Sequence, residues 1–225
     1  MRLSIIVPAL DEAREIVAAL EALAPLRASG HEVIVVDGGS ADGTPALAAG
    51  LADRILQAPR GRARQMNAGA AVASGDALIF LHADTRLPPG AAPLVLEALA
   101  GRGWGRFDVR IEGRSPLLAV VAFCMNWRSR LSGIATGDQA MFVRREVFAA
   151  AGRFSDIPLM EDVALSARLK KISPPACLPQ RVVTSGRGWE RRGVLRTILL
   201  MWRLRLAYFL GARPEDLARR YANGT

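Results

Sequence analysis

EVIVVDGGSADGT, residues 32–44, is the stretch that decides the fold. Its first five residues are almost continuously apolar, which is typical of a strand buried on both faces of a parallel sheet. Glycine and polar residues at 38–43 predict a turn. Thr44 is expected to cap a helix whose first residue is Pro45. The stretch therefore predicts the strand, turn and helix start of one βα unit.

The same unit recurs on both sides of residues 32–44. Pro8 is expected to end the first strand, because proline cannot donate a ladder hydrogen bond. Further strands are expected at 3–7, 53–58 and 77–81, and helices at 12–23 and 62–73. The order β-α-β-α-β-α-β predicts an α/β fold with an open, mostly parallel sheet flanked by helices.

Beyond residue 100 the pattern is less regular. Strands are expected at 104–111 and 139–144, and helices at 116–131, 161–171 and 194–210. The last of these has two interpretations. Its apolar stripe packs on the domain, or the stripe and its arginines lie on an anionic membrane surface, as basic amphipathic helices can.

Composition and charge narrow the class of protein. With 51% hydrophobic residues in 225, the chain is not intrinsically disordered. The net charge of +9 is uneven, since residues 1–100 carry 8 basic and 11 acidic side chains and residues 101–225 carry 22 and 10. No helix-turn-helix, zinc finger or aromatic RNA platform is recognisable, so we expect no nucleic-acid partner. Cys124 and Cys177 are too few for a disulfide framework.

Charged residues gather where the expected parallel strands end. Asp11 and Glu12 follow the first strand, Asp37 ends the second, and His82 and Asp84 follow the fourth. An arginine cluster follows the third strand: Arg60, Arg62 and Arg64. Open α/β sheets bind ligands beyond the carboxyl ends of their strands, so a ligand site is expected at this edge. The chain has no G-x-G-x-x-G, P-loop or G-x-S-x-G pattern, which disfavours dinucleotide binding and acyl transfer.

Five motifs in order carry a resemblance to a known family. They are SIIVPALDE at 4–12, VDGGSADGT at 36–44, NAGA at 67–70 with ASGD at 73–76, FLHAD at 80–84, and Glu161-Asp162. Together they resemble the family 2 glycosyltransferases, which have the GT-A fold, over residues 3–170. The short chain and the LHADT variant at 81–85 look like the arsenosugar-biosynthesis type within that family.

The resemblance implies a nucleotide-sugar donor, usually UDP-linked, held by the N-terminal half. Pro8 and Glu12 would line the nucleoside pocket, and Asp37 would hydrogen-bond the base. The three arginines at 60, 62 and 64 suit a diphosphate, because guanidinium groups bind phosphate oxygens in pairs. Gly38 stands where the family usually has a second aspartate.

The resemblance also implies a metal ion and a base. Asp84, the last residue of the family's D-x-D motif, would hold a divalent cation, Mn²⁺ or Mg²⁺. His82 stands in place of the first aspartate, and it is expected to touch the ribose or a phosphate, to ligate the metal, or only to pack. Asp162, beside Glu161, would deprotonate the acceptor hydroxyl.

The resemblance thus implies an inverting, metal-dependent glycosyltransferase of the hexosyltransferase type. Its acceptor is expected to be a small molecule or a lipid-linked one. The single GT-A domain is expected to comprise a nucleotide-binding half at 1–100, an acceptor half at 101–185 and C-terminal helices at 186–225. The alternatives are a sugar-nucleotide nucleotidyltransferase and a catalytically degenerate nucleotide-binding relative.

The expected location is the cytoplasm, or the periphery of the inner membrane face through helix 194–210. The apolar run at 3–7 is too short for a signal peptide and is followed by Pro8 and acidic residues.

Overall fold

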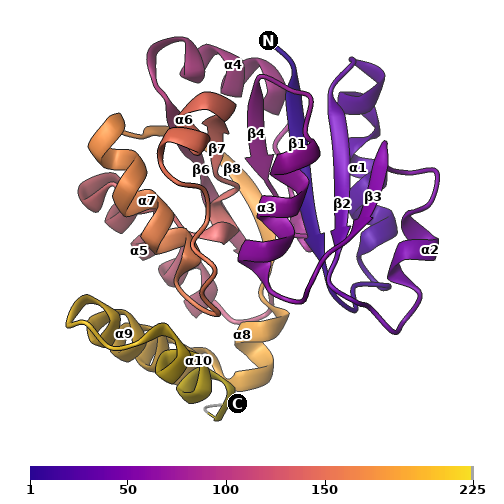
Figure 1. The fold of residues 1–225 in the computed structure, drawn as a ribbon. Coiled ribbons are helices and arrows are strands. Elements are labelled where there is room, and N and C mark those ends of the chain that lie inside the picture. The colour runs from indigo at the N-terminus through magenta and orange to yellow at the C-terminus, as the bar shows by residue number, and fades with distance from the viewer. Residues whose placement is uncertain (224–225) are drawn as a thin grey trace.

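The computed structural model describes residues 1–223, which contain a curled eight-stranded sheet with helices on both faces (Figure 1). Its strand order is β3-β2-β1-β4-β7-β6-β8-β5. The parallel part is formed by β1 (Leu3–Ala9), β2 (Glu32–Asp37), β3 (Arg54–Gln57) and β4 (Ala77–Phe80). Between these strands lie α1 (Ile16–Ala28), α2 (Thr44–Ala48) and α3 (Arg62–Val72). The predicted βα order and the α/β class are confirmed.

The second half adds mixed pairings. β7 (Phe142–Arg144) is antiparallel to β4 and to β6 (Trp104–Glu112), β6 is parallel to β8 (Ala176–Ser185), and β5 (Thr85–Arg86) pairs antiparallel with β8. The remaining elements are α4 (Ala91–Gly101), α5 (Leu117–Ser132), the 3₁₀ turn η1 (Gly137–Gln139), α6 (Arg145–Ala150), α7 (Glu161–Ile172), α8 (Arg187–Arg192), α9 (Val194–Phe209) and α10 (Pro214–Asn223). β5, β8, α4 and α6 had no counterpart in the sequence analysis, and α8 and α10 were expected only as helices without bounds within 186–225.

Pro8 does not end the first strand, because β1 continues through it to Ala9. The Ile6 carbonyl accepts from Leu81 on the β4 side, and the Ala9 carbonyl accepts from Gly38 on the β2 side. The backbone N and C=O groups of successive residues in a strand point toward opposite neighbouring strands. Pro8 lies two residues after Ile6, so its nitrogen points toward β4, as the Ile6 carbonyl does. The pairing of β1 with β4 ends at Ile6, so no ladder hydrogen bond is lost there.

Two expectations about the first loops need correction. α1 begins at Ile16 rather than at residue 12, because the preceding segment is bound to the turn after β2: the Glu12 N–H donates to Thr44 Oγ1 and the Ala13 N–H to Asp42 Oδ2, both at 2.9 Å. Thr44 does not cap α2, since it is the first residue of that helix and Gly43 occupies the cap position. Its hydroxyl holds the first loop instead.

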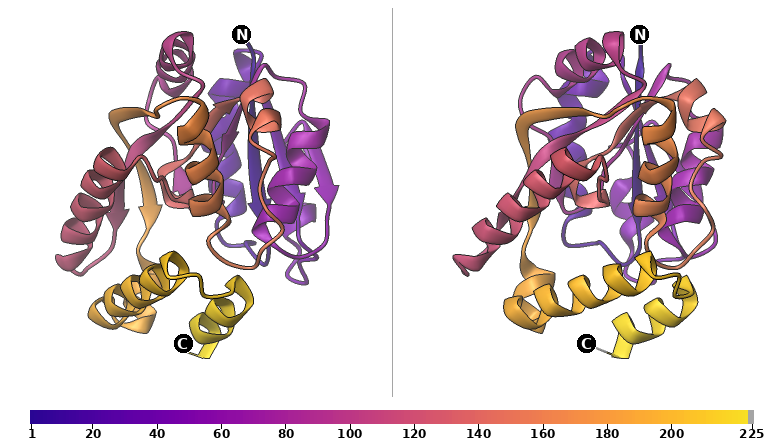
Figure 2. Two further views of the ribbon diagram at one scale, coloured as in Figure 1. Left: turned by 60° about the vertical axis from the view of Figure 1, so that its left-hand side comes forward. Right: turned by 90° about the vertical axis from the view of Figure 1, so that its left-hand side faces the viewer.

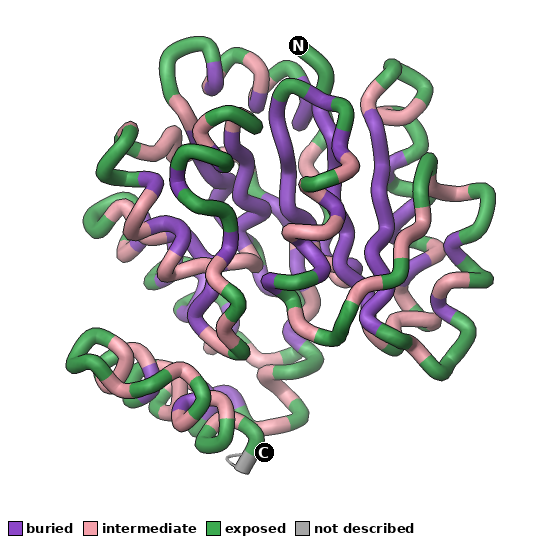
Figure 3. Tube along the Cα trace, in the orientation of Figure 1, coloured by how far each residue is buried: buried purple, intermediate pink, exposed green. Residues whose placement is uncertain are grey.

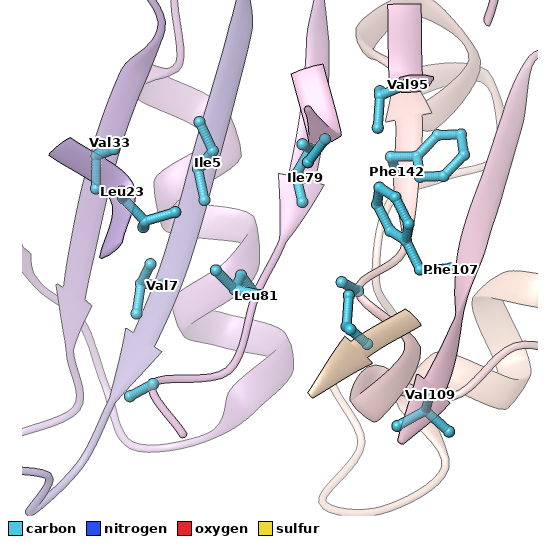
Figure 4. Packing of buried hydrophobic residues seen from close by; sticks show 14 of the residues in the cluster. Ile5, Val7, Leu23, Val33, Ile79, Leu81, Val95, Phe107, Val109 and Phe142 are labelled. Atoms are coloured by element: carbon cyan, nitrogen blue, oxygen red, sulfur yellow. The ribbon is translucent and has the colours of Figure 1, made fainter. Parts of the chain in front are cut away.

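The apolar core lies on both faces of the sheet. Ile5 and Val7 point to the face covered by α1, α4 and α5, and Ile6 points to the face covered by α3, α6 and α7. Figure 4 shows the first of these layers continuing across the sheet to Phe107 and Phe142, whose rings meet edge to face. This alternation has the period of two that a strand buried on both faces requires.

The C-terminal helices α8–α10 lie across the side of the molecule where β1 and β2 end (Figure 2). They are attached at few points, and Figure 3 shows few buried residues in them. Met160, Leu204 and Leu217 form a small separate cluster, and Arg187 pairs with Glu15 at 2.7 Å.

Helix α9 does not pack its apolar stripe on the domain, so that interpretation is wrong. The buried residues of α9 are Val194, Thr197 and Leu204, and Ile198 packs half-buried against the core. Exposed instead are Leu195, Leu199, Trp202, Leu206 and Phe209. No helix among residues 1–223 combines the length and apolar character needed to span a bilayer.

Candidate active site

Hydrogen bonds between two loops shape the edge of the sheet where the strands end. Two hydrogen bonds join the loop after β1 to the loop after β2. The Asp11 N–H donates to Ser40 Oγ at 2.9 Å, and the Ala41 N–H donates to Asp11 Oδ1 at 2.9 Å. Asp42 accepts from Thr44 as well as from Ala13 and so fixes the turn before α2. These bonds fix the segment that carries Pro8 and Glu12.

Gln65 is a structural residue of this edge that the sequence analysis missed. Its Nε2 donates to the carbonyls of Ala9 and Val36, both at 2.8 Å, and so joins the ends of β1 and β2. A Cβ atom at Gly38 would lie 3.0 Å from that Nε2. The buried glutamine therefore occupies the space that a second aspartate at position 38 would need.

A cavity of about 340 Å³ opens at this edge. Among its lining residues are five of the predicted donor-side residues, namely Pro8, Glu12, Arg60, Arg62 and His82. Asp84 and Gln65 also line it. Burial, and then the charge of Asp84, raises the pKa of Glu12 above its ordinary value.

Two predicted donor-side residues lie apart from this cavity. Asp37 is buried, and its carboxylate accepts from the backbone of Gly39 and Ser40 and from the Ser40 hydroxyl. Arg64 pairs with Asp156 at 2.8 Å. Because helix residues two positions apart point in different directions, Arg64 faces away from Arg62. The expected cluster of three arginines is therefore corrected to Arg60 and Arg62.

A second cavity, of about 380 Å³, adjoins the first. Four residues line both cavities: Arg62, His82, Asp84 and Asp138. A third cavity, of about 690 Å³, opens beside Glu12 and Arg187. Within the described part of the chain, Asp84 alone lines all three cavities. The predicted metal ligand thus lies where the cavities meet.

His82 is held by the turn η1. Its Nδ1 lies 3.4 Å from Asp138 Oδ1, and a Cβ atom at Gly137 would lie 2.6 Å from its Nε2. Burial opposes ionisation of Asp138, but the hydrogen bond from His82 and the charges of Arg62 and Arg128 outweigh it and lower its pKa. The His82 imidazole can therefore lie at the junction because Gly137 leaves space for it and the Asp138 carboxylate pairs with it.

Glu161 and Asp162 open α7 on the wall of the second cavity. Asp162 accepts from the Gly137 N–H at 2.8 Å and from the Val163 N–H at 2.7 Å. Burial is nevertheless the largest influence and raises the pKa of Asp162, with the charge of Asp138 adding to it. Burial and the charge of Asp162 raise the pKa of Glu161. A carboxylate with a raised pKa is a stronger base, which suits proton abstraction.

The side chains around Asp84 could bind a metal ion only if a bound ligand supplied further coordinating atoms. No group of three or more His, Cys, Asp or Glu side chains in residues 1–223 could enclose a cation. Asp84 and Glu12 both line the first cavity, and the charge of Asp84 is, after burial, the second cause of the raised pKa of Glu12. Divalent ions bound by one or two carboxylates complete their shell with substrate phosphates.

The far wall of the second cavity is cationic and comes from the C-terminal helices. Arg192 and Arg205 line it beside Trp189 and Tyr221, and the Arg192 guanidinium lies 4.5 Å from the centre of the Tyr221 ring. The buried Nε atoms of both arginines have no hydrogen-bond partner within residues 1–223. The sequence analysis did not identify Arg205 or Tyr221, because no local motif marks them.

Two comparisons of sequence identify relatives. The profile of glycosyl transferase family 2 matches residues 4–112. An uncharacterised glycosyltransferase of Mycobacterium tuberculosis strain H37Rv is 30% identical over 175 residues, which cover 71% of this chain and 66% of that protein. The chain thus spans about two thirds of the length of this relative.

Solved structures share the fold at low identity. The Pyrobaculum calidifontis mannosyltransferase in complex with GDP-Man and Mn²⁺ has a TM-score of 0.66 at 21% identity, covering 99% of this chain and 69% of its own. The S. aureus protein TarS with UDP-GlcNAc has a TM-score of 0.64 at 16% identity, covering 82% and 58%.

Glucosyl-3-phosphoglycerate synthase of M. tuberculosis, in complex with Mn²⁺, UDP and its product, has a TM-score of 0.61 at 20% identity. That match covers 88% of this chain and 78% of the synthase. The fold is therefore GT-A. The profile match and the mycobacterial relative show that the chain belongs to glycosyl transferase family 2.

Proposed function

We propose that the chain transfers a sugar from a nucleoside diphosphate donor, UDP-linked, to an acceptor hydroxyl with inversion. The observation that carries this proposal is the pair of adjoining cavities with Arg62, His82, Asp84 and Asp138 in common. One cavity offers space for a donor and the other for an acceptor. The reacting sugar would then lie at the junction.

The first cavity is proposed to take the donor. Arg60 and Arg62 line it and can bind diphosphate oxygens, while Pro8 and Glu12 contribute a wall for the nucleoside. Recognition of uracil by Asp37 stays a prediction. It would require the carboxylate to give up part of its bonding to the 39–40 turn.

The cofactor is proposed to be Mn²⁺ or Mg²⁺ held by Asp84. The M. tuberculosis synthase and the P. calidifontis mannosyltransferase were solved with Mn²⁺, and the synthase also with Mg²⁺. When bound, such an ion offsets the negative charge that develops on the departing diphosphate. His82, held by Asp138, is proposed to bind the ribose or a phosphate at the same junction.

Asp162 is proposed to act as the base. Its carboxylate lies on the wall of the second cavity, and the backbone N–H groups of Gly137 and Val163 fix its orientation. It would accept the proton of the acceptor hydroxyl as that oxygen attacks the anomeric carbon from the side opposite the diphosphate. Glu161 adds a second carboxyl group to this wall of the cavity. The proposed transferred group is a hexosyl unit.

The acceptor is proposed to occupy the second cavity, as a small molecule or as the exposed end of a lipid-linked one. Arg192 and Arg205 offer hydrogen-bond donors there, and Trp189 offers an aromatic face. A cytoplasmic location, or a peripheral one through residues 194–210, stays a prediction of the sequence. The single-domain division at 1–100, 101–185 and 186–225 is likewise proposed, with residues 224–225 outside the described part.

A thermal-shift screen tests the proposal. UDP, GDP and their sugars are added with and without Mn²⁺ or Mg²⁺, and the right donor at ~100 times its Kd should stabilise the fold by roughly 2.7 kcal/mol. A metal-dependent response to a UDP-sugar, with release of UDP, is expected. Binding without any hydrolysis or transfer would favour the degenerate relative, and no response to any nucleotide would contradict the proposal.

A further inference from the structure

Exposed apolar side chains are concentrated in two places on this molecule. Of thirteen large hydrophobic residues exposed within residues 1–223, ten lie on α5 or between Leu195 and Leu210. Scattered single exposed hydrophobics are normal, but contiguous patches mark interaction sites. These ten are too concentrated to be surface background.

On α5 the exposed residues form a single face. Val120, Phe123, Trp127 and Leu131 are spaced by three or four positions, which places them on one side of the helix. The rings of Phe123 and Trp127 are 6.2 Å apart, and Leu131 is 81% exposed. The opposite side of α5 packs on the sheet.

On α9 the same spacing recurs. Leu195, Leu199, Trp202, Leu206 and Phe209 are exposed, with Phe209 at 86%. The inward side of α9 contributes Thr197, Met201 and Arg205 to the proposed acceptor cavity. One helix therefore lines the cavity with one side and exposes an apolar stripe on the other.

The two helices adjoin. Leu118 near the start of α5 and Val194 at the start of α9 belong to one apolar cluster. Figure 2 shows both helices lengthwise on the same side of the molecule, in the view where the left side of Figure 1 faces the reader. The two exposed stripes, defined as the docking face, thus extend from a common corner.

The charge of these helices selects the partner. α5 and α9 contain no acidic residue. Of their five arginines, Arg130 pairs with Asp108 at 2.7 Å, Arg205 lines the acceptor cavity and Arg128 has buried nitrogen atoms, so two remain for the docking face. Arg196 and Arg203 are exposed and form no ion pair within the described residues. In a two-fold dimer the same patch would meet itself and bring like charges together. An anionic bilayer instead complements both the apolar stripes and the arginines.

We propose that the docking face of α5 and α9 lies on a bilayer with anionic headgroups, so that the protein is a peripheral membrane protein whose acceptor cavity lies directly behind the bound helix. Trp127 and Trp202 would reach the level of the headgroups and the apolar residues would enter the acyl boundary. This extends the contact expected for residues 194–210 to a second helix. The proposal does not depend on the transfer reaction, since it concerns binding to lipid alone.

Vesicle co-sedimentation of the full chain tests it. Wild-type protein is mixed with vesicles of phosphatidylcholine containing 30% phosphatidylglycerol, or of phosphatidylcholine alone, at low and high salt. Binding to the anionic vesicles is expected, with a loss of at least about tenfold when the anionic lipid is removed. Absence of binding to anionic vesicles at low salt overturns the proposal.

Paired variants separate the two helices. Trp202→Ser with Leu206→Ser, and Phe123→Ser with Trp127→Ser, should each weaken vesicle binding at least about tenfold. The matched control is Leu47→Ser with Ile172→Ser, exposed residues outside both stripes, which should bind as wild type. If the α5 pair also binds as wild type, α5 is not part of the docking face and the two-helix proposal fails.

Cys124 provides a probe that needs no new cysteine. It is exposed on α5 next to Phe123. In a Cys177→Ser protein, an environment-sensitive fluorophore on Cys124 should shift to shorter wavelength with anionic vesicles and not without them. A shift that depends on protein concentration in the absence of lipid, together with sedimentation as a dimer, would assign the face to a second copy and overturn the membrane proposal.

Discussion

The two walls of the candidate site are built differently. The donor-side wall consists of turns after parallel strands, and Asp11, Ser40, Asp42 and Thr44 bond these turns to one another. The acceptor-side wall combines η1, the start of α7 and the C-terminal helices. It holds two adjacent carboxylates with raised pKa, where the donor-side wall has one, Glu12. It also holds two arginines whose Nε atoms have no hydrogen-bond partner among residues 1–223.

This difference suggests that the donor-side wall binds the nucleotide and that the acceptor-side wall carries the catalytic residues. A wall whose polar groups already bond one another is preorganised for a constant ligand, such as a nucleotide. A wall with perturbed carboxylates and open donors is typical of a catalytic surface that meets its partner only on binding. Substitutions on the two walls should therefore have different effects.

The largest effect is expected at Asp162. Asp162→Asn keeps the size of the side chain but removes the proposed base, so the rate of sugar transfer should fall by about 10²–10⁴-fold. Donor affinity should stay within about twofold, because the donor-side wall is untouched. Single-turnover kinetics with the donor found by thermal shift measure both. The matched control is Asp156→Asn, an exposed carboxylate paired with Arg64, which should transfer normally.

A smaller loss is expected from the turn that holds His82. In Gly137→Ala the new Cβ would meet the imidazole, so the ring or the turn must move. Displacements of about 1 Å at a reacting centre can cost up to about 10²-fold in rate. Gly188→Ala is the control, because it lies on the same cavity and its Cβ would contact nothing within 4 Å. Equal activity of the two variants would remove His82 from the site.

A substitution in the donor-side wall should lower the free energy of unfolding. Thr44→Val leaves the Glu12 N–H without its acceptor, which should lower the free energy of unfolding by about 1–3 kcal/mol and weaken donor binding. Thr197→Val on the acceptor-side wall loses only a hydroxyl bond within α9. Urea unfolding compares them. A larger loss for the Thr197 variant would contradict the preorganised donor wall.

The smallest effect concerns pH. Burial and the charge of Asp162 raise the pKa of Glu161 above 4.5, so above that pH the folded protein binds more protons than the unfolded chain. Stability from this group therefore falls as pH rises through its raised pKa. Glu161→Gln should have a higher Tm than wild type at pH 7, and the gain should shrink near pH 4. A lower Tm at pH 7 would show that the charge stabilises the fold.

The donor half of the fold could be predicted because its signals are local. Strands such as 32–37 are apolar runs followed by turn residues, and parallel strands bring their ends to one edge without further information. Glu12, His82 and Asp84 were predicted at this edge in this way, and Pro8 through the family resemblance, and all four line the first cavity. Arg64 was misplaced because the helix period was not applied to it: two positions along the predicted helix 62–73 turn a side chain in a different direction.

Apart from Glu161 and Asp162, which the family resemblance supplied, the acceptor-side wall could not be predicted because its contacts are distant in sequence. No local sequence pattern pairs His82 with Asp138, or places Arg205 and Tyr221 on the same cavity as Asp162. The sequence also could not show whether the apolar stripe of α9 faces the domain or solvent. An apolar periodicity identifies one side of a helix but not what that side contacts. Gln65 escaped notice because a buried glutamine that joins two carbonyls leaves no motif.

Donor binding by Asp84→Ala tests the central claim, that the cavities meet at a metal-assisted diphosphate site. Calorimetric titration of UDP into wild-type protein should show binding that requires Mn²⁺ or Mg²⁺. The Asp84→Ala protein should lose the metal-dependent part, while Asp162→Asn retains it. If Asp84→Ala bound UDP with wild-type affinity and the same response to metal, the assignment of the junction would be wrong.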